Sequence, residues 1–250
     1  MVDLLPGSEP FSAPGGDVGV VVLHGFTGNP VSMRPMAEAL AGAGYAVELP
    51  RLPGHGTTIE DLLTHTWEDW TGEAARAFDD LAARCARVAV VGLSMGGALT
   101  ADLATRRDVA GCVFINPLVK PVASEVLALL DDALAQGVTV FETGAESDIK
   151  RPGATEMAYS GWPLPALRNL MDALVGVHSR LGEITAPCLV MTSREDHTVT
   201  TDNSEDLVAA VAGPVEHVWL EDSYHVATID NDQALVEELT LGFVARATAP

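Results

Sequence analysis

Short apolar runs alternate along this chain with longer segments whose apolar residues recur every three or four positions. Several of the short runs are apolar at every position, which is typical of strands covered by helices on both faces of a sheet. Strand and helix in repetition predict a mostly parallel sheet with helices on both sides. We expect strands at residues 18–23, 45–49, 88–93, 111–115, 188–192 and 215–220.

Two of the helical segments present a clear apolar face. In the first, this face is expected to hold Trp67, Trp70, Phe78, Leu81 and Cys85. In the second, near the end of the chain, it is expected to hold Leu235, Val236, Leu239 and Phe243. Such one-sided helices are what a sheet covered on both faces requires.

The alternation breaks between residues 118 and 183, where we find no convincing pair of strands. Two stretches there, SEVLALLDDALAQG and LPALRNLMDALVGVHSRLG, predict helices, and residues 137–165 between them contain glycine and proline. We interpret this region as an insertion: a small cap of residues 118–183 on a core of residues 1–117 and 184–250. The alternative is a pair of longer crossover connections within the sheet.

The composition fits one large domain with a small insertion, since 48% of the 250 residues are apolar and 20% are charged. Lys and Arg number 14 against 35 Asp and Glu, which gives a net charge of −21 at pH 7. Such acidity argues against nucleic acid as a partner and against binding to anionic membrane surfaces. No apolar run approaches the roughly 20 residues of a membrane-spanning helix, so we expect no stable membrane insertion.

Three cysteines, Cys85, Cys112 and Cys188, cannot all form pairs, and none lies near another in the sequence. Two of them fall in predicted strands, where a free cysteine packs as a small apolar residue. Free thiols indicate a reducing compartment, and the N-terminal MVDLLPGSEPF lacks the basic start and long apolar stretch of a signal peptide. We therefore expect a cytoplasmic protein, as a monomer or a homodimer.

The stretch VVGLSMGGAL, residues 90–99, has a serine between glycines where a predicted strand meets a predicted helix. Gly92, Ser94 and Gly96 fit the pattern G-x-S-x-G, in which the serine occupies a sharp and strained turn. A side chain at either glycine would collide across this turn, which exposes the serine oxygen at the carboxyl edge of the sheet. Ser94 is the candidate nucleophile. The alternative is a glycine-rich turn that only lets the helix pack closely on the strand.

A serine hydroxyl becomes a nucleophile when a base takes its proton, and the base needs a third group that orients it. His225 follows the last predicted strand, and Asp196 follows the strand before it. The order serine, aspartate, histidine is the one expected when all three emerge from the carboxyl edge of such a sheet. We therefore predict a catalytic triad of Ser94, Asp196 and His225, with activity falling below about pH 6 as the histidine becomes protonated.

Other histidines and carboxylates compete for these roles and fit them less well. His197 neighbours Asp196 in the chain, so its ring should point away from that carboxylate. The alternative acids, Glu195 and Asp222, are each offset from the expected loop position. Of the other histidines, His55 lies in a loop where a structural role is expected, and His217 lies within a predicted strand. His65 and His178 lie in helical or flanking segments with no carboxylate placed to orient them.

The stretch LHGFTGNP, residues 23–30, leaves the first long strand and carries two glycines before a helix. Acyl transfer develops an oxyanion, and backbone N–H groups must already point at it, since losing one such donor costs about 3 kcal/mol. Phe26 is placed to offer one N–H. Met95 offers the other from the N-terminus of the helix after Ser94, where the helix dipole helps. His24 is expected to be buried and hydrogen-bonded behind this loop.

With the motifs LHGFTGNP, LPGHG, VVGLSMGG, SREDHTV and SYHVATIDND, the chain resembles the α/β-hydrolase family over nearly its whole length. More narrowly, it looks like the bacterial carboxylesterases and monoacylglycerol lipases with a small cap. The resemblance implies Ser94 as nucleophile, Asp196 as acid and His225 as base. It also implies that the Phe26 and Met95 amides form the oxyanion hole for a small-molecule ester substrate.

These residues together predict a serine carboxylic-ester hydrolase that cleaves short- to medium- or long-chain acyl esters through an acyl-enzyme on Ser94. Glu156 and Tyr159 in the cap are candidates for meeting a polar alcohol such as glycerol. No cofactor or metal is expected, since the chain has no H-E-x-x-H, no clustered Cys and His set, and no G-x-x-x-x-G-K-[ST]. Two alternatives stay open: the same triad acting on a thioester or a carbon–carbon bond, and a catalytically silent receptor for a small molecule.

Overall fold

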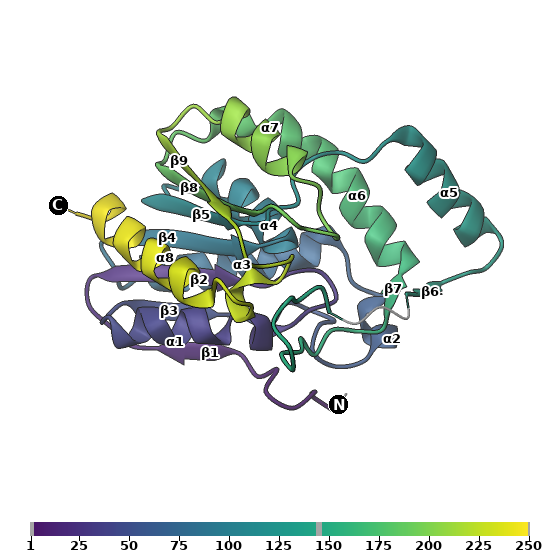
Figure 1. The fold of residues 1–250 in the computed structure, drawn as a ribbon, viewed down its shortest axis with the longest axis horizontal. Coiled ribbons are helices and arrows are strands. Elements are labelled where there is room, and N and C mark those ends of the chain that lie inside the picture. The colour runs from purple at the N-terminus through teal and green to yellow at the C-terminus, as the bar shows by residue number, and fades with distance from the viewer. Residues whose placement is uncertain (1–2, 144–146, 250) are drawn as a thin grey trace.

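The computed structural model describes residues 3–143 and 147–249 and is built around a seven-stranded sheet (Figure 1). The strand order is β1-β3-β2-β4-β5-β8-β9, and every pair is parallel except the edge pair of β1 and β3. The predicted mostly parallel sheet is therefore confirmed. Its strands are β1 (Phe11–Ala13), β2 (Val18–Leu23), β3 (Ala46–Leu49), β4 (Arg87–Leu93), β5 (Gly111–Ile115), β8 (Cys188–Ser193) and β9 (Val215–Leu220).

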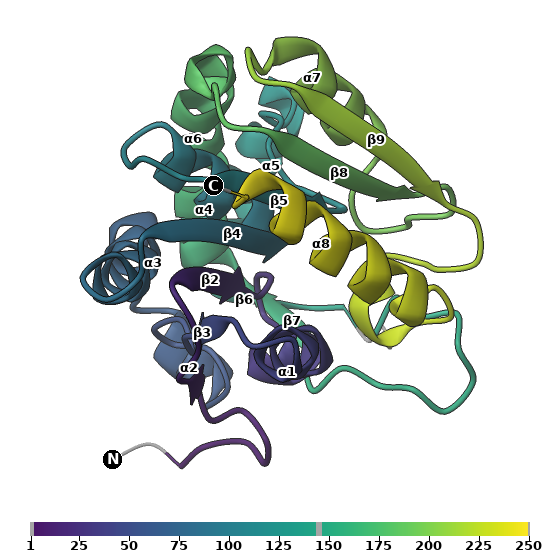
Figure 2. The same cartoon turned by 90° about the vertical axis from the view of Figure 1, so that its left-hand side faces the viewer.

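Helices cover both faces of this sheet, as Figure 2 shows. On one face lie α1 (Arg34–Gly42) and α8 (Gln233–Ala247), and on the other lie α3 (Trp67–Ala82), α4 (Met95–Ala104) and α7 (Asp202–Ala210). No helix in the described part of the chain is long and apolar enough to cross a membrane. The shorter helical turns are η1 (Pro30–Ser32), α2 (Ile59–Leu62), η2 (Leu181–Glu183) and η3 (Ala227–Ile229).

Burial follows the apolar pattern of the sequence in the strands and in α3. All of β5 and all of β2 beyond its first residue are buried. Each large apolar side chain taken out of water contributes about 1.5–3 kcal/mol to folding, so this continuous burial stabilises the layered arrangement. In α3, the predicted face is buried from Trp67 to Leu81, but Cys85 lies beyond the end of the helix and is half-buried.

The apolar face predicted for α8 is wrong at one position. Val236 and Phe243 are buried and Leu239 packs against the core, but Leu235 is 39% exposed. The reason is helical geometry, because residues three, four and seven apart share a face while neighbouring residues point about 100° apart. Leu235 therefore lies at the flank of the face that Val236 and Phe243 define.

The region between β5 and β8 contains α5 (Ser124–Ala135), β6 (Val140–Glu142), β7 (Gly161–Pro163) and α6 (Leu164–Ser179). The two predicted helices are confirmed, but the expectation of no strand pair is wrong, since β6 and β7 pair antiparallel. With three residues each, these strands, like β1, are too short for a periodic pattern to appear. Figure 1 shows α5 standing apart from the sheet, whereas α6 packs on α3 and α4 through buried Leu170 and Leu174.

Because the six strands β3, β2, β4, β5, β8 and β9 run in the same direction, their carboxyl ends meet at one edge of the sheet. The loop with His24 follows β2, Ser94 follows β4, Asp196 follows β8 and His225 follows β9. The fold thus gathers residues from distant parts of the sequence at this edge.

Candidate active site

Ser94 lies on the tight turn between β4 and α4. Its backbone has φ 56° and ψ −119°, a left-handed conformation that is strained for a residue with a side chain. A Cβ built on Gly92 would overlap the carbonyl oxygen of Gly96, and one built on Gly96 would overlap that of Leu23. The N–H of Ser94 donates to Ile115 O at 3.1 Å, which ties the turn to β5. The predicted strained turn is confirmed.

Asp196 and His225 meet in a buried pair. His225 Nδ1 donates to Asp196 Oδ2 at 2.8 Å, and the side chains of His225 and Asp196 are 8% and 2% exposed, respectively. The other carboxylate oxygen of Asp196 accepts the N–H groups of Thr198 at 2.8 Å and of Val199 at 2.7 Å. The carboxylate is therefore fixed by bonds to both oxygens, and Nε2 is the imidazole nitrogen left to accept a proton.

Opposing effects act on the pKa of His225. Burial lowers this pKa, whereas the charge and hydrogen bond of Asp196 and the charges of Glu156 and Asp148 raise it, and the net result lies above 6.5. The imidazole thus takes up a proton at a higher pH than an isolated histidine. The value of about pH 6 expected from the sequence is therefore too low.

The loop after β2 runs alongside Ser94. A Cβ on Gly25 would lie 3.2 Å from the Cβ of Ser94 and 3.7 Å from its Oγ, so glycine permits this close approach. Phe26 comes next, and its N–H has no hydrogen-bond partner among the described residues. Met95 is the first residue of α4, where N–H groups have no partner within the helix. Two N–H donors beside Ser94 are what an oxyanion hole requires, and that role stays a prediction.

His24 is buried behind this loop, as expected. Leu52 N–H donates to His24 Nε2 at 3.1 Å, so the ring proton is on Nδ1, which donates to Gly25 O at 3.0 Å. Burial, helped by the charge of Arg51 and opposed by the hydrogen bond to Gly25, lowers the pKa of His24 to about 4. The neutral ring therefore connects the residue before Phe26 to the loop after β3.

The competitors nearest to Asp196 are engaged elsewhere. His197 Nδ1 donates to Asp148 Oδ1 at 2.8 Å, so its ring turns away from Asp196, as predicted. Of the alternative acids, Asp222 lies 3.1 Å and Glu195 lies 3.7 Å from Lys150 Nζ, and both are mostly exposed. These carboxylates belong to surface ion pairs and not to the buried pair.

The remaining histidines lie in other surroundings. His217 shares a hydrogen bond with Thr192 Oγ1 at 2.9 Å. His65 lies 3.4 Å from Asp69 and 3.7 Å from Asp61, so the expectation that no carboxylate is placed near it is wrong. These two aspartates lie four positions before and after His65 in the sequence, and such spacing brings side chains together when the chain turns between α2 and α3.

Two polar residues that the sequence analysis missed hold the loops of Asp196 and His225. Asn116, directly after β5, donates from Nδ2 to His225 O at 2.7 Å and accepts the N–H of Ser193 on Oδ1 at 2.7 Å. The signal for Asn116 is a polar residue that directly follows a wholly apolar strand. The carboxylate of Asp148 accepts N–H groups from both loops, but it lies in a stretch without periodicity, which offers no comparable signal.

Glu156 projects from the segment between β6 and β7 towards the same edge. It is half-buried, and its Oε1 would lie 2.5 Å from a Cβ built on Gly28 of the loop after β2. Burial raises the pKa of Glu156, against the opposing effects of the His225 charge and of a hydrogen bond with Ser32. A carboxyl group thus lies next to the loop that carries Phe26 and within electrostatic reach of His225.

Tyr159 lies on the same segment but its hydroxyl is already occupied. The hydroxyl donates to Gly54 O at 2.8 Å and accepts the N–H of Thr57 at 2.9 Å. Its backbone N–H donates to Thr27 O at 3.1 Å. Tyr159 therefore connects its segment to the loops after β2 and β3, which leaves Glu156 as the candidate for contact with a polar alcohol.

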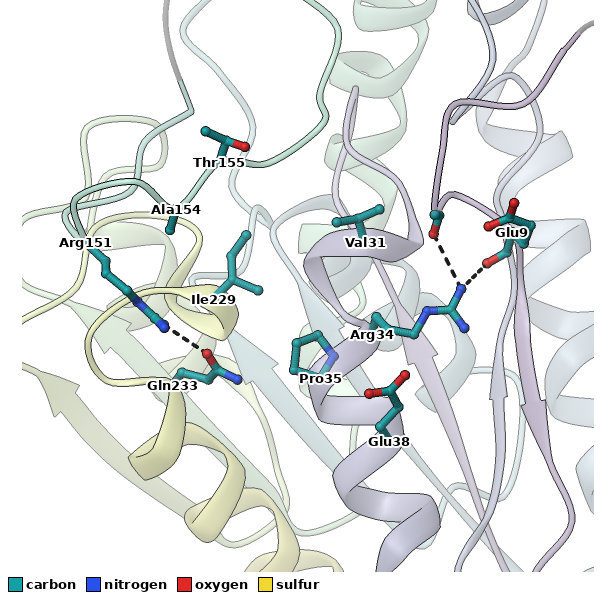
Figure 3. Close-up of a pocket in the computed structure, with 11 residues that line it drawn as sticks. Glu9, Val31, Arg34, Pro35, Glu38, Arg151, Ala154, Thr155, Ile229 and Gln233 are labelled. Carbon is teal, nitrogen blue, oxygen red and sulfur yellow. Dashed lines mark hydrogen bonds between the residues drawn. The ribbon is translucent and has the colours of Figure 1, made fainter.

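An open groove of about 660 Å³ lies between the N-terminal segment, α1, residues 151–155 and α8 (Figure 3). Its two arginines point towards partners in the protein: Arg34 donates to Glu9 O at 2.5 Å, and Arg151 donates to Gln233 Oε1 at 2.9 Å. Ser94, Asp196 and His225 are not among the residues that line it. The groove is thus separate from the candidate active site.

Among residues 3–143 and 147–249, no group of three or more His, Cys, Asp or Glu side chains is arranged to hold a metal ion. Asp196 and His225 bind each other, and Cys112 faces Cys188 across β5 and β8. Both of these cysteines are free and buried in the core, as expected.

The fold and the site together define a class of protein. A serine on a strained strand-to-helix turn, followed in the sequence by a buried aspartate–histidine pair at the same edge of a mostly parallel sheet, is the arrangement of the α/β hydrolases. Residues 20–238 match the alpha/beta hydrolase family. The chain belongs to this family.

Its relatives include a lipase and an esterase that match nearly the whole chain. The thermostable monoacylglycerol lipase of Bacillus sp. (strain H-257) is 40% identical over 251 residues, or 97% of this chain and 96% of that protein. The carboxylesterase of Bacillus subtilis (strain 168) is 27% identical over 244 residues, or 95% and 96% of the two chains.

Solved structures agree with this assignment. A structure from work on LipS and LipT, two metagenome-derived lipolytic enzymes, has a TM-score of 0.92 and 40% identity over 98% of this chain and 100% of that chain. The monoacylglycerol lipase of Paleococcus ferrophilus has a TM-score of 0.80 at 16% identity, over 96% and 98% of the two chains, and shares the fold.

Proposed function

We propose that this protein is a serine hydrolase of carboxylic esters and that monoacylglycerols are among its substrates. The observation that carries the proposal is the buried hydrogen bond between Asp196 and His225, at the sheet edge where Ser94 occupies its strained turn. The names of the two bacterial relatives, monoacylglycerol lipase and carboxylesterase, support an ester as the bond that is cleaved.

In the proposed mechanism, His225 takes the hydroxyl proton of Ser94 on Nε2 while the serine oxygen attacks the ester carbonyl carbon. Asp196 keeps the other ring proton on Nδ1 and stabilises the imidazolium that forms. The carbonyl oxygen becomes an oxyanion that accepts the N–H groups of Phe26 and Met95, and each such donor contributes about 3 kcal/mol to the transition state.

The second half of the reaction regenerates the serine. The alcohol leaves with the proton from His225, and the acyl group stays on Ser94 as an ester. Water then gives a proton to His225 and attacks the acyl carbon, which forms the same oxyanion. When the bond between the acyl carbon and Ser94 breaks, His225 returns that proton to the serine oxygen and the acid is released.

Glu156 is our candidate for the alcohol side of the substrate. Its half-buried carboxyl lies beside Gly28 and within electrostatic reach of His225, which donates a proton to the leaving alcohol in this mechanism. A glycerol hydroxyl can donate a hydrogen bond to a carboxyl oxygen. We further propose that residues 118–183 form the cap that carries Glu156 over a core of residues 1–117 and 184–250.

The test is hydrolysis of a graded series of acyl methyl esters and monoacylglycerols, with thioester and diketone analogues beside them. Wild type should cleave the oxygen esters, and Ser94→Ala should lose at least about 10³-fold in kcat while keeping its thermal unfolding midpoint. In the same assay, Glu156→Ala, which removes both acceptor oxygens, should raise KM for a monoacylglycerol and leave KM for the matching methyl ester unchanged.

Other outcomes select other functions. If the protein cleaves thioesters or diketones but no oxygen esters, the proposed bond is wrong and the proposed triad still stands. A wild-type protein that cleaves nothing and whose Ser94 does not react with a fluorophosphonate would overturn the enzymatic proposal and favour a small-molecule receptor.

We also propose a cytoplasmic location for a monomer or homodimer. Cys112 and Cys188 support a reducing compartment, because they face each other in adjacent strands as free thiols. Sedimentation of the purified protein measures the oligomeric state, and fractionation of cells measures the location.

A further inference from the structure

A short segment of the region between β5 and β8, residues 147–151, crosses the loop that carries His225, and we call it the strap. The carbonyl oxygen of Asp148 accepts the N–H of Val226 at 3.2 Å. The carboxylate of Asp230, in the loop after β9, accepts the N–H groups of Lys150 and Arg151, both at 2.8 Å. Backbone hydrogen bonds therefore fix the strap to the loop of the candidate base.

Side chains at the far end of the strap add further anchors. Arg151 Nη2 donates to Gln233 Oε1 at 2.9 Å at the start of α8 (Figure 3), and Lys150 Nζ lies 3.1 Å from Asp222. These anchors hold the strap without any help from the side chain of Asp148. The role of that side chain is therefore a separate question.

The carboxylate of Asp148 collects donors from two different loops. Its Oδ2 accepts the N–H of His197 at 3.0 Å and the N–H of His225 at 3.3 Å. Its Oδ1 accepts His197 Nδ1 at 2.8 Å, and the hydroxyl of Thr198 approaches Oδ2 at 3.4 Å. One carboxylate, 16% exposed, thus connects the residue after Asp196 to the backbone of His225 itself.

The two loops it connects are the ones whose relative position determines the Asp196–His225 hydrogen bond. Asn116 also holds the His225 loop, but it bonds the carbonyl oxygen of His225, whereas Asp148 bonds the N–H of that residue. The other end of the Asn116 amide accepts the N–H of Ser193. Without the Asp148 carboxylate, the N–H of His225 would have no acceptor among the described residues, and hydrogen bonds to a charged group are stronger than those between neutral groups.

We propose that Asp148 is a positioning residue, whose carboxylate holds the loops of Asp196 and His225 in the relative position that the acid–base pair requires. This inference rests on the proposed function, since it assigns Asp148 to the same reaction. The strap thereby makes the geometry of the acid–base pair depend on a segment inserted between β5 and β8.

Misplacement of a catalytic group affects the chemical step more than the binding of substrate. Loss of the carboxylate should therefore lower kcat and leave KM nearly unchanged. A second effect concerns charge: burial lowers the pKa of His225, whereas Asp196, Glu156 and Asp148 all raise it, so loss of the Asp148 charge lowers this pKa.

Two substitutions separate position from charge. Asp148→Ala removes every acceptor, whereas Asp148→Asn keeps one oxygen for the backbone N–H groups of His197 and His225 and replaces the charged oxygen that accepts His197 Nδ1 with a neutral NH2 group. The matched control is Asp222→Ala, which breaks the exposed ion pair with Lys150 and leaves the Asp148 carboxylate in place. For each protein, kcat and KM for a soluble ester are measured per active site titrated with a fluorophosphonate, from acid to neutral pH.

We expect Asp148→Ala to lose about 10- to 100-fold in kcat with little change in KM. Asp148→Asn should recover most of that loss, and in both variants the acidic limb of kcat/KM should move to lower pH. The control should match wild type in kcat and in its acidic limb. Wild-type kcat in Asp148→Ala, an equal loss in Asp148→Asn, or an equal loss in Asp222→Ala would overturn the proposal.

A spectroscopic measurement keeps the test independent of ester turnover. In wild type and in Asp148→Asn, the proton on His225 Nδ1 should give a downfield NMR signal from its hydrogen bond to Asp196, and this signal should weaken or vanish in Asp148→Ala. If the signal persists unchanged in Asp148→Ala, the positioning role fails even where the enzyme is active. If wild type cleaves no ester but the signal depends on Asp148, only the proposed function fails.

Discussion

His225 accepts a proton only while it is neutral, and its surroundings set the pH range in which that holds. Burial lowers its pKa and favours the neutral base, but the three carboxylates of Asp196, Glu156 and Asp148 outweigh burial and raise the pKa above 6.5. Asp196, which orients the ring through its hydrogen bond to Nδ1, thus also makes the ring easier to protonate. A general base with a pKa near the working pH combines a useful neutral fraction with strong basicity.

The pH dependence of ester hydrolysis follows from this balance. We expect kcat/KM to fall about tenfold per pH unit on the acid side of the His225 pKa, because only the neutral imidazole takes the Ser94 proton. The midpoint of this fall should lie above 6.5. Initial rates at low substrate concentration in a series of buffers measure it. A rate that stays flat as the pH falls through this region would contradict the assignment of His225.

At the scale of elements, the turn between β4 and α4 combines strain with close packing. Ser94 has φ 56°, and the adjacent glycines leave no room for a Cβ beside the carbonyl oxygens of Gly96 and Leu23. These atoms belong to the backbone, so they move only if β4, α4 or the loop after β2 moves. The candidate oxyanion donors Phe26 and Met95 lie on these same elements, so packing and chemistry are linked here.

Gly92→Ala should therefore destabilise the fold by about 1–3 kcal/mol, because the added methyl group overpacks the turn. It should lower kcat as well, since the displaced backbone carries Ser94. The control is Gly72→Ala in the exposed part of α3, where no atom lies within 4 Å of the new Cβ. There alanine should add up to about 1 kcal/mol of stability, because it favours the helix over glycine. Urea unfolding measures both changes, and equal effects at the two positions would contradict the packing argument.

At the scale of the whole molecule, acid stability depends on groups that folding keeps neutral. His24 and His55 are buried in contact with each other, and burial lowers both pKa values, that of His24 to about 4. As pH falls below 6.5, the unfolded chain takes up protons on these rings before the folded protein does, so stability is lost. His225 and Glu156 act in the opposite sense, because neighbouring carboxylates raise the pKa of His225 against its burial, and burial raises the pKa of Glu156 in the folded state.

His24→Gln isolates one of these contributions. As the pH falls from 6.5 to about 4, the free energy of unfolding of wild type should decrease by about 3 kcal/mol more than that of His24→Gln. The reason is that each unit of pKa shift corresponds to about 1.4 kcal/mol. The variant is expected to be less stable at neutral pH, because it loses one of the two hydrogen bonds of His24. Urea unfolding curves at neutral and acid pH give the difference. Parallel losses in the two proteins would show that His24 is not kept neutral.

Much of the fold was predictable because burial on both faces leaves a direct mark on the sequence. Strands β2, β4, β5 and β8 appear as apolar runs, and the glycines around Ser94 indicate a turn that only glycines permit. The three-residue strands β1, β6 and β7 were missed, since three residues cannot show a period. Leu235 was placed on the buried face of α8 although its neighbour Val236 sets the direction of that face.

The candidate site was predictable only in part. Ser94, Asp196 and His225 follow strands, and parallel strands end at one edge, so their placement at that edge follows from the order of elements. The occupied hydroxyl of Tyr159 and the support that Asn116 and Asp148 give to His225 depend on loops that return from distant positions. No local pattern encodes such contacts.

The sequence by itself determined a parallel sheet covered by helices, a strained serine turn, and the order in which an acid and a base follow it, because each of these arises from local spacing of apolar, glycine and polar residues. Only the tertiary structure decided which carboxylates surround His225, that together they raise its pKa, and that the strap ties its loop to that of Asp196. Those properties depend on distances between residues that lie far apart in the chain, and burial and charge act through such distances.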